Sequence, residues 1–204
     1  MTFIKALCEK DFFTCPDIFE NKYIYDHLSN ITSEKYKRES TAAYSLLAEM
    51  LGFHFGICIK DVDIVLNEYG KPLISGKDVC FNLSHSNGLV VCAVSNENVG
   101  VDVEFIRDVR PLIKKKCMTS READSIIFPK DFYRIWTLKE AYFKYVGTGI
   151  NRSMTDIEFV FDSGIHCFEN GVLSSLTFKS FDFGEHIISL CTKDYEIFGD
   201  IILE

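Results

Sequence analysis

Two carboxylates separated by a single residue stand in the segment VGVDVEFI, residues 99–106. Apolar residues alternate with Gly100, Asp102 and Glu104, and this period of two predicts a β-strand with both carboxylates on one face. Two like charges about 4 Å apart in a partly shielded site repel by roughly 4 kcal/mol. Either water dilutes this repulsion, or a cation lies between the two side chains.

A third carboxylate lies in residues 131–146, which predict a helix ended by the following GTG. One face carries an apolar stripe of helical spacing, formed by Phe132, Ile135, Trp136, Tyr142, Phe143 and Val146. Lys139 falls inside this stripe, so its amine must either reach solvent or meet an anion. Glu140 and Lys144 lie one turn apart at the edge, where an ordinary surface pair contributes a few tenths of a kcal/mol.

Together the strand and the helix offer three oxygen ligands without a nearby Cys or His in the sequence, which suits a hard cation such as Mg²⁺. Mg²⁺ in proteins usually also binds substrate phosphate, and the two lysines could neutralise phosphate oxygens. The loop predicted for FNLSHSNG, residues 81–88, adds Ser84, His85 and backbone donors. A Ser–His–Asp hydrolase is not favoured, because Ser84 and His85 are adjacent and no GxSxG motif occurs.

The elements that position these residues follow from periodicity and turn signals. Strands and helices interleave without regular βαβ spacing, so we expect an α+β fold with antiparallel sheets. The segment 89–94 predicts a strand that forms a hairpin with the strand at 99–106. The other expected elements are a helix at 33–51 capped by Ser33, a strand at 63–67, a turn at 68–72, one or two helices within 107–128, and mostly strands from 157 onward.

Composition narrows the class of protein. The chain has 204 residues, is 47% hydrophobic and carries a net charge of −8, which argues against nucleic acid as a partner. Its eight cysteines form no CxxC pair and several lie in apolar runs, so we expect free, buried thiols. Charges interrupt the first residues, and no apolar run approaches about 20 residues, so we expect a cytoplasmic protein without a membrane partner.

The ordered motifs FNLSHS (81–86), GVDVE (100–104) and WTLKEAYFKYVGTG (136–149) resemble those of the Sfp-type 4′-phosphopantetheinyl transferases, and EYGKP (68–72) matches as well. The resemblance implies a pseudo-dimer of two similar α+β halves with the active site in the cleft between them. We expect an N-terminal half at 1–97 with coenzyme A contacts. We expect a C-terminal half at 98–204 with the metal site, the catalytic helix and the carrier-protein docking surface.

The activity that the resemblance implies is transfer of the 4′-phosphopantetheine arm of coenzyme A to a serine of an acyl or peptidyl carrier protein. The reaction needs Mg²⁺ and releases 3′,5′-ADP. The metal ligands of the family are resembled by Asp102, Glu104 and Glu140. Glu140 also resembles the general base that takes the proton of the carrier serine, either directly or through water. Lys144 resembles the lysine on the transferred phosphate, and Lys139 is expected to support the phosphates or the site wall.

Coenzyme A contacts are implied at four further positions. Ser84 and His85 resemble residues that hold its phosphates, with His85 expected near the 3′-phosphate. Lys71 resembles a contact near the adenine, and Lys35 resembles a lysine on the 3′-phosphate. The chain departs from some relatives at two positions: Tyr44 replaces an arginine, and an upstream lysine is either replaced by Thr32 or absent. Selectivity for the 3′-phosphate is therefore expected to be weaker, or to use Lys37 or Arg38.

The segment 105–121 carries six basic residues against one acidic residue, mixed with apolar side chains. Such a segment could dock an acidic helix of a carrier protein, although a solvated helix face explains it equally well. The docking residues that we expect are Ile106, Arg110, Leu112, Lys114, Lys115 and Lys116.

Two other classes of function stay open at this point. One is a non-catalytic coenzyme A-binding protein on the same fold, and the other is a Mg²⁺-dependent phosphohydrolase with water as the nucleophile. Analysis of the products separates them from the transferase. We expect the protein to act as a monomer.

Overall fold

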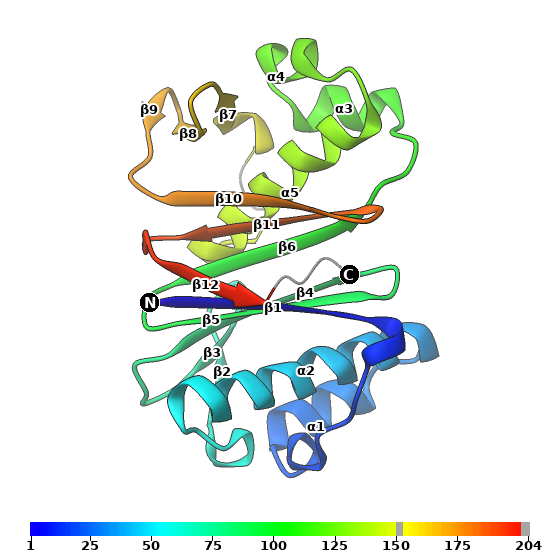
Figure 1. The fold of residues 1–204 in the computed structure, drawn as a ribbon, viewed down its shortest axis with the longest axis vertical. Helices are drawn as coiled ribbons and strands as arrows, with labels where there is room; N and C mark the ends of the chain where they lie inside the picture. Colours follow the sequence, from blue (N-terminus) through cyan, green and yellow to red (C-terminus); the bar gives the residue numbers. More distant parts are fainter. Residues whose placement is uncertain (150–152, 201–204) are drawn as a thin grey trace.

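Two sheets lie face to face between two long helices, so the molecule has the layer order helix, sheet, sheet, helix (Figure 1). The computed structural model describes residues 1–149 and 153–200. The first sheet has the strand order β12-β1-β5-β4 and is covered by α2, and the second has the order β10-β11-β6 and is covered by α5. Two smaller sheets, β2-β3 and β7-β8-β9, lie outside these layers.

The bounds of the elements follow in chain order. The helices are α1 (Lys22–Ser29), α2 (Glu34–Phe55), α3 (Pro111–Cys117), α4 (Ser120–Ser125) and α5 (Pro129–Val146). The strands are β1 (Thr2–Cys8), β2 (Ile64–Leu66), β3 (Pro72–Ile74), β4 (Cys80–Ser86), β5 (Leu89–Ser95), β6 (Val99–Phe105), β7 (Ile157–Phe161), β8 (Ile165–Glu169), β9 (Val172–Leu173), β10 (Thr177–Phe183), β11 (His186–Thr192) and β12 (Ile197–Asp200).

Both long helices form where the sequence predicts them, although α5 begins at Pro129, two residues before its predicted start, and α2 ends later than predicted. The Ser33 side chain accepts a hydrogen bond from the Tyr36 N–H and caps α2, which runs four residues beyond the predicted end to Phe55 and is followed by Gly56 in the left-handed conformation. Helix α5 ends at Gly147, also left-handed, as the GTG signal predicts. The predictions of both helices are therefore confirmed.

Strand β6 is confirmed over Val99–Phe105 and has two different faces. Val101 and Val103 are buried in the apolar core between the two sheets. Gly100 lies against α5, where an added Cβ would overlap the carbonyl oxygen of Ala141 and the amide nitrogen of Tyr145. The alternation therefore directs Asp102 and Glu104 to the α5 side of the sheet.

Two predictions of local structure are wrong. Residues 80–86 form strand β4 instead of a loop, and their backbone pairs with β5. The predicted hairpin of β5 with β6 does not form, because β5 pairs with β1 on one edge and with β4 on the other. Strand β6 pairs with β11 in the second sheet.

The α+β class is confirmed, and each half places a long helix on a mainly antiparallel sheet. One strand pair of the first sheet is parallel instead of antiparallel: β12, which follows all the other strands in the sequence, pairs with β1. The boundary between residues 97 and 98 stays a prediction. Within residues 1–149 and 153–200, no helix is both long and apolar enough to cross a membrane.

Candidate active site

Three carboxylates meet where β6 faces α5. Asp102 and Glu104 come from alternate positions of β6, and Glu140 comes from α5. Burial and the neighbouring Asp102 raise the pKa of Glu140 to about 7. Burial and the charge of Asp102 also raise the pKa of Glu104. The predicted repulsion between these side chains is therefore present in the folded protein.

Lys144 supplies positive charge to this acidic cluster. Its Nζ lies 2.8 Å from Oδ1 of Asp102 and 2.9 Å from Oγ of Ser84, and it also donates to the Val101 carbonyl at 3.1 Å. Lys144 thus pairs with the carboxylate of Asp102 on the strand against which α5 packs, and its charge partly offsets the rise in the pKa of Glu140. The amine holds α5 and β6 together at the site.

The cluster fits a bound cation. Oδ2 of Asp102 and Oε1 of Glu140 are buried and have no hydrogen-bond partner among the described residues. An unsatisfied buried carboxylate oxygen is costly, and a cation between such oxygens removes both that cost and the mutual repulsion. In the part of the chain that the structure describes, no three side chains are already close enough to form a complete metal-binding group. Water and phosphate oxygens are the usual remaining ligands of Mg²⁺.

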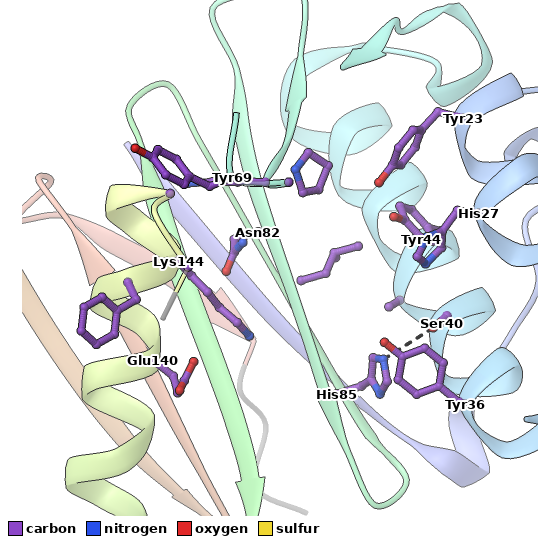
Figure 2. A pocket seen from close by; sticks show the side chains of 18 residues that line it. Tyr23, His27, Tyr36, Ser40, Tyr44, Tyr69, Asn82, His85, Glu140 and Lys144 are labelled. Carbon is purple, nitrogen blue, oxygen red and sulfur yellow. Dashed lines mark hydrogen bonds between the residues drawn. The ribbon is translucent and has the colours of Figure 1, made fainter. Parts of the chain in front are cut away.

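A pocket of about 370 Å³ opens beside the acidic cluster, between α2 and α5 (Figure 2). Glu140 and Lys144 border it on the α5 side, while His85 on β4 projects toward the α2 side (Figure 2). Lys71 also lines it, so the structure brings together four of the predicted site residues. Its aromatic lining consists of Tyr23, His27, Tyr36, Tyr44, Tyr69, His85 and Phe143.

His85 is fixed in this wall by the first half of the chain. Its Nδ1 lies 2.9 Å from Oε2 of Glu39, its Nε2 is 3.5 Å from Oγ of Ser40, and its ring packs edge-on against Tyr36. Burial lowers the pKa of His85, and the Glu39 carboxylate partly offsets this effect. Sequence analysis missed Glu39, because an acidic residue inside a predicted amphipathic helix carries no signal of its own.

The Lys71 side chain lines the pocket, but its terminal amine is hydrogen-bonded to backbone carbonyls rather than directed into the pocket. Nζ donates to the carbonyl oxygens of Val99 and Tyr145 at 3.2 and 3.3 Å. Burial lowers the pKa of Lys71 to about 8. This lysine therefore links the turn between β2 and β3 to the base of the acidic cluster.

Lys139 does not lie in the pocket, and its predicted place beside the phosphates needs correction. Its side chain is fully buried, with Nζ 2.6 Å from Oε2 of Glu122 and further hydrogen bonds to the carbonyls of Cys117 and Met154. All three ammonium protons therefore have protein acceptors. The prediction that this lysine meets an anion is confirmed, and the anion is Glu122 of α4.

The cations expected near the 3′-phosphate lie outside the pocket. Lys35 donates to Oδ1 of Asn87 at 2.9 Å, and together with Lys37 and Arg38 it lines a separate groove on the other side of α2. At the pocket itself stands Tyr44, buried and packed edge-on against His27, with a pKa raised by burial and by the neighbouring Tyr23.

The expected docking segment lies near Glu104, outside the pocket that Glu140 and Lys144 line. Ile106 is half-buried against the core of the second half, whereas Leu112 on α3 is 81% exposed. Lys115 and Lys116 are exposed, and Lys114 donates to the Ile126 carbonyl at 3.4 Å. Arg110 lines a groove of about 420 Å³ that also reaches Glu104 and Trp136.

Comparison with known proteins connects this geometry to a family. Residues 98–195 match the model of the 4′-phosphopantetheinyl transferase superfamily. The chain is 33% identical over 150 residues to the 4′-phosphopantetheinyl transferase gsp of Aneurinibacillus migulanus, which covers 64% of this chain and 62% of that protein. It is 29% identical over 147 residues to Sfp of Bacillus subtilis, which covers 65% and 66%. The predicted family resemblance is confirmed.

The range that matches the phosphopantetheinyl transferase model contains the acidic cluster and Lys144, whereas Lys71 and His85 precede it. The phosphopantetheinyl transferase HetI of a Nostoc strain is 33% identical over 129 residues, which cover 57% of this chain and 54% of that protein. The chain spans less than two thirds of the length of each of these relatives. A crystal structure of Thermotoga maritima holo-[acyl-carrier-protein] synthase aligns with 22% identity and a TM-score of 0.40 over 46% of this chain and 61% of that one, too low to support an argument.

The raised pKa of Glu140 predicts a pH dependence of stability in metal-free protein. A carboxyl whose pKa rises from 4.5 to about 7 on folding favours the folded state at low pH and loses this contribution as the pH rises toward 7. We expect wild type to lose about 1–3 kcal/mol of unfolding free energy relative to Glu140→Gln between pH 5 and pH 8. Urea denaturation in EDTA measures the difference. A difference independent of pH would contradict the burial of this charge.

Proposed function

We propose that the protein transfers the 4′-phosphopantetheine arm of coenzyme A to a serine of an acyl or peptidyl carrier protein and releases 3′,5′-ADP. One observation carries the proposal. The acidic cluster of Asp102, Glu104 and Glu140 has two buried oxygens without a hydrogen-bond partner among the described residues and adjoins Lys144, and Glu140 and Lys144 line a pocket between α2 and α5. The family resemblance supplies the reaction for which this arrangement is suited.

Mg²⁺, held by Asp102, Glu104 and Glu140, would supply positive charge to the diphosphate oxygens of the donor. Lys144 adds a fixed positive charge where charge develops on the transferred phosphoryl group. Glu140 lines the pocket beside Lys144, where its carboxylate is suited to accept the proton of the carrier serine. The pocket would take the nucleotide end of coenzyme A among its tyrosine and histidine rings.

The first test is the intact mass of an apo carrier protein after incubation with this protein, coenzyme A and Mg²⁺, beside an EDTA control. A metal-dependent gain of one phosphopantetheine is the expected result. No gain on fatty-acid, polyketide or peptide carriers, with coenzyme A still bound, supports the binding-protein alternative. Cleavage of coenzyme A without a carrier supports the phosphohydrolase.

We expect the carrier to dock on the basic segment around α3, because its exposed lysines and Leu112 complement an acidic, partly apolar helix. Reversing the charge of Lys114–Lys116 to glutamate should raise the KM for the carrier by roughly 10-fold and leave the KM for coenzyme A unchanged. The matched control reverses three other exposed lysines, Lys22, Lys77 and Lys193. Equal effects of the two triple variants on the carrier KM would show that only net charge matters.

We expect weak selectivity for the 3′-phosphate of the donor. A hydrogen bond to a charged group contributes about 1.5–3 kcal/mol, but Tyr44 is uncharged and Lys37 and Arg38 line another groove. The values of kcat/KM for coenzyme A and 3′-dephospho-coenzyme A should therefore differ by less than about 10-fold. A much larger preference for coenzyme A would show that a positively charged side chain, such as Lys37 or Arg38, reaches the 3′-phosphate in the complex.

A further inference from the structure

The polar face of β4 touches the edge of β6 without any backbone pairing between the two strands. Three alternate side chains of β4 each accept a hydrogen bond from alternate N–H groups of β6. These bonds run from the N–H groups of Val101, Val103 and Phe105 to Asn82, Ser84 and Ser86, over 2.8, 3.3 and 3.2 Å. The side-chain ladder fixes the position of β4 along β6 where the two halves meet.

Two members of this ladder also donate a proton. Oγ of Ser84 donates to Oδ1 of Asp102 at 2.9 Å, and Oγ of Ser86 donates to Oε2 of Glu104 at 3.1 Å. A hydroxyl that accepts from a backbone N–H and donates to a carboxylate has its single proton committed to that carboxylate. Each acidic side chain of β6 is thus oriented by its own serine from β4.

The two carboxylates differ in their other support. Asp102 is also held by an ion pair with Lys144 at 2.8 Å, whereas Glu104 forms no ion pair with any residue that the structure describes and is supported, besides Ser86, by the Trp136 side chain and the charge of Arg107. Loss of the Ser84 hydroxyl would leave Asp102 its ion pair with Lys144, whereas loss of the Ser86 hydroxyl would leave Glu104 without a bond of that strength to any described residue. Ser84 in addition contacts Lys144, so its replacement would disturb two charged groups at once.

We propose that Ser86 is a positioning residue that orients Glu104 toward a divalent cation, an assignment that rests on the proposed function. Groups that hydrogen-bond a metal ligand typically change metal affinity by roughly 10- to 100-fold when they are removed. The proposal extends the site into the first half of the chain, at a residue that touches neither the pocket nor Lys144 in the structure.

Binding of Mn²⁺ to the free protein, followed by the electron paramagnetic resonance signal of unbound Mn²⁺, tests this role without turnover. Ser86→Ala should weaken Mn²⁺ binding by about 10-fold, while Ser86→Thr, which keeps the hydroxyl, should restore it to near the wild-type value. Asn82→Ala removes a ladder bond of the same kind but no bond to a carboxylate, so its Mn²⁺ affinity should equal that of wild type. Thermal melts of each variant establish that it is folded.

Unchanged Mn²⁺ affinity in Ser86→Ala would overturn the proposal, and so would an equal loss in Asn82→Ala, which would mean general loosening of the two strands. Wild type that binds no Mn²⁺ would overturn it as well. The carrier mass assay decides the proposed function separately. If the wild-type protein modifies carriers but Ser86→Ala binds Mn²⁺ as tightly as wild type does, only the positioning role of Ser86 is refuted. If Ser86→Ala weakens Mn²⁺ binding but the wild-type protein modifies no carrier, only the proposed function is refuted.

Discussion

Glu140→Ala is expected to reduce transfer of the phosphopantetheine arm by at least about 10²- to 10⁴-fold, the usual contribution of a general base. The variant loses the carboxylate that faces Asp102 and Glu104, and with it one of the two unpartnered buried oxygens of the site. Initial rates on a carrier protein measure the loss. Calorimetry should still detect binding of coenzyme A, because Lys144, Lys71 and His85 keep their places around the pocket.

Two controls define this result. Glu140→Gln keeps the shape of the side chain but cannot accept a proton, so it should be nearly as inactive as Glu140→Ala. Glu20→Gln removes an exposed carboxylate that lies 3.9 Å from Lys60 and should be as active as wild type. Transfer at the wild-type rate by Glu140→Ala would remove this residue from the chemistry.

The largest effect on stability is expected from Gly100→Ala. The new methyl group would overlap the backbone of Ala141 and Tyr145, and backbone cannot move aside as a flexible side chain does. Overpacking usually costs about 1–3 kcal/mol and sometimes more, so we expect a loss of at least about 3 kcal/mol. For a chain of this size, that loss lowers Tm by roughly 6–12 °C.

Gly52→Ala is the matched control for this substitution. Gly52 lies within α2, and a Cβ added there would meet no atom within 4 Å. Because alanine favours the helix, this variant should be more stable than wild type by about 0.5–1 kcal/mol. Denaturant unfolding of both variants gives the comparison. Similar stability of Gly100→Ala and wild type would mean that α5 can shift away from β6.

The strand and the helix that form the acidic cluster were predictable because their periodicity is strong. Alternation from Val99 to Phe105 and the stripe from Phe132 to Val146 each favour one element, and the structure brings their charged residues together. The roles of these residues stay proposals, because geometry alone does not show a reaction.

Other features depend on contacts between distant parts of the chain. The polar residues of FNLSHS suggest a loop, yet Asn82, Ser84 and Ser86 form one face of β4, where they accept hydrogen bonds from backbone N–H groups of β6. The short turn after β5 suggests a hairpin, but both edges of β5 are already paired. The partner of Lys139 was likewise not predictable, since nothing near Glu122 in the sequence marks it for burial.

The parallel pairing of β12 with β1 has a consequence for how the chain reaches this structure. Thr2 pairs with Ile197, so the first sheet lacks a strand until almost the whole described chain has left the ribosome. Until then the outer edge of β1 exposes unpaired backbone groups, which invite association with other nascent chains. Contacts of such long sequence separation also slow folding. The first sheet is therefore complete only after residues 197–200 have been synthesised and have paired with β1.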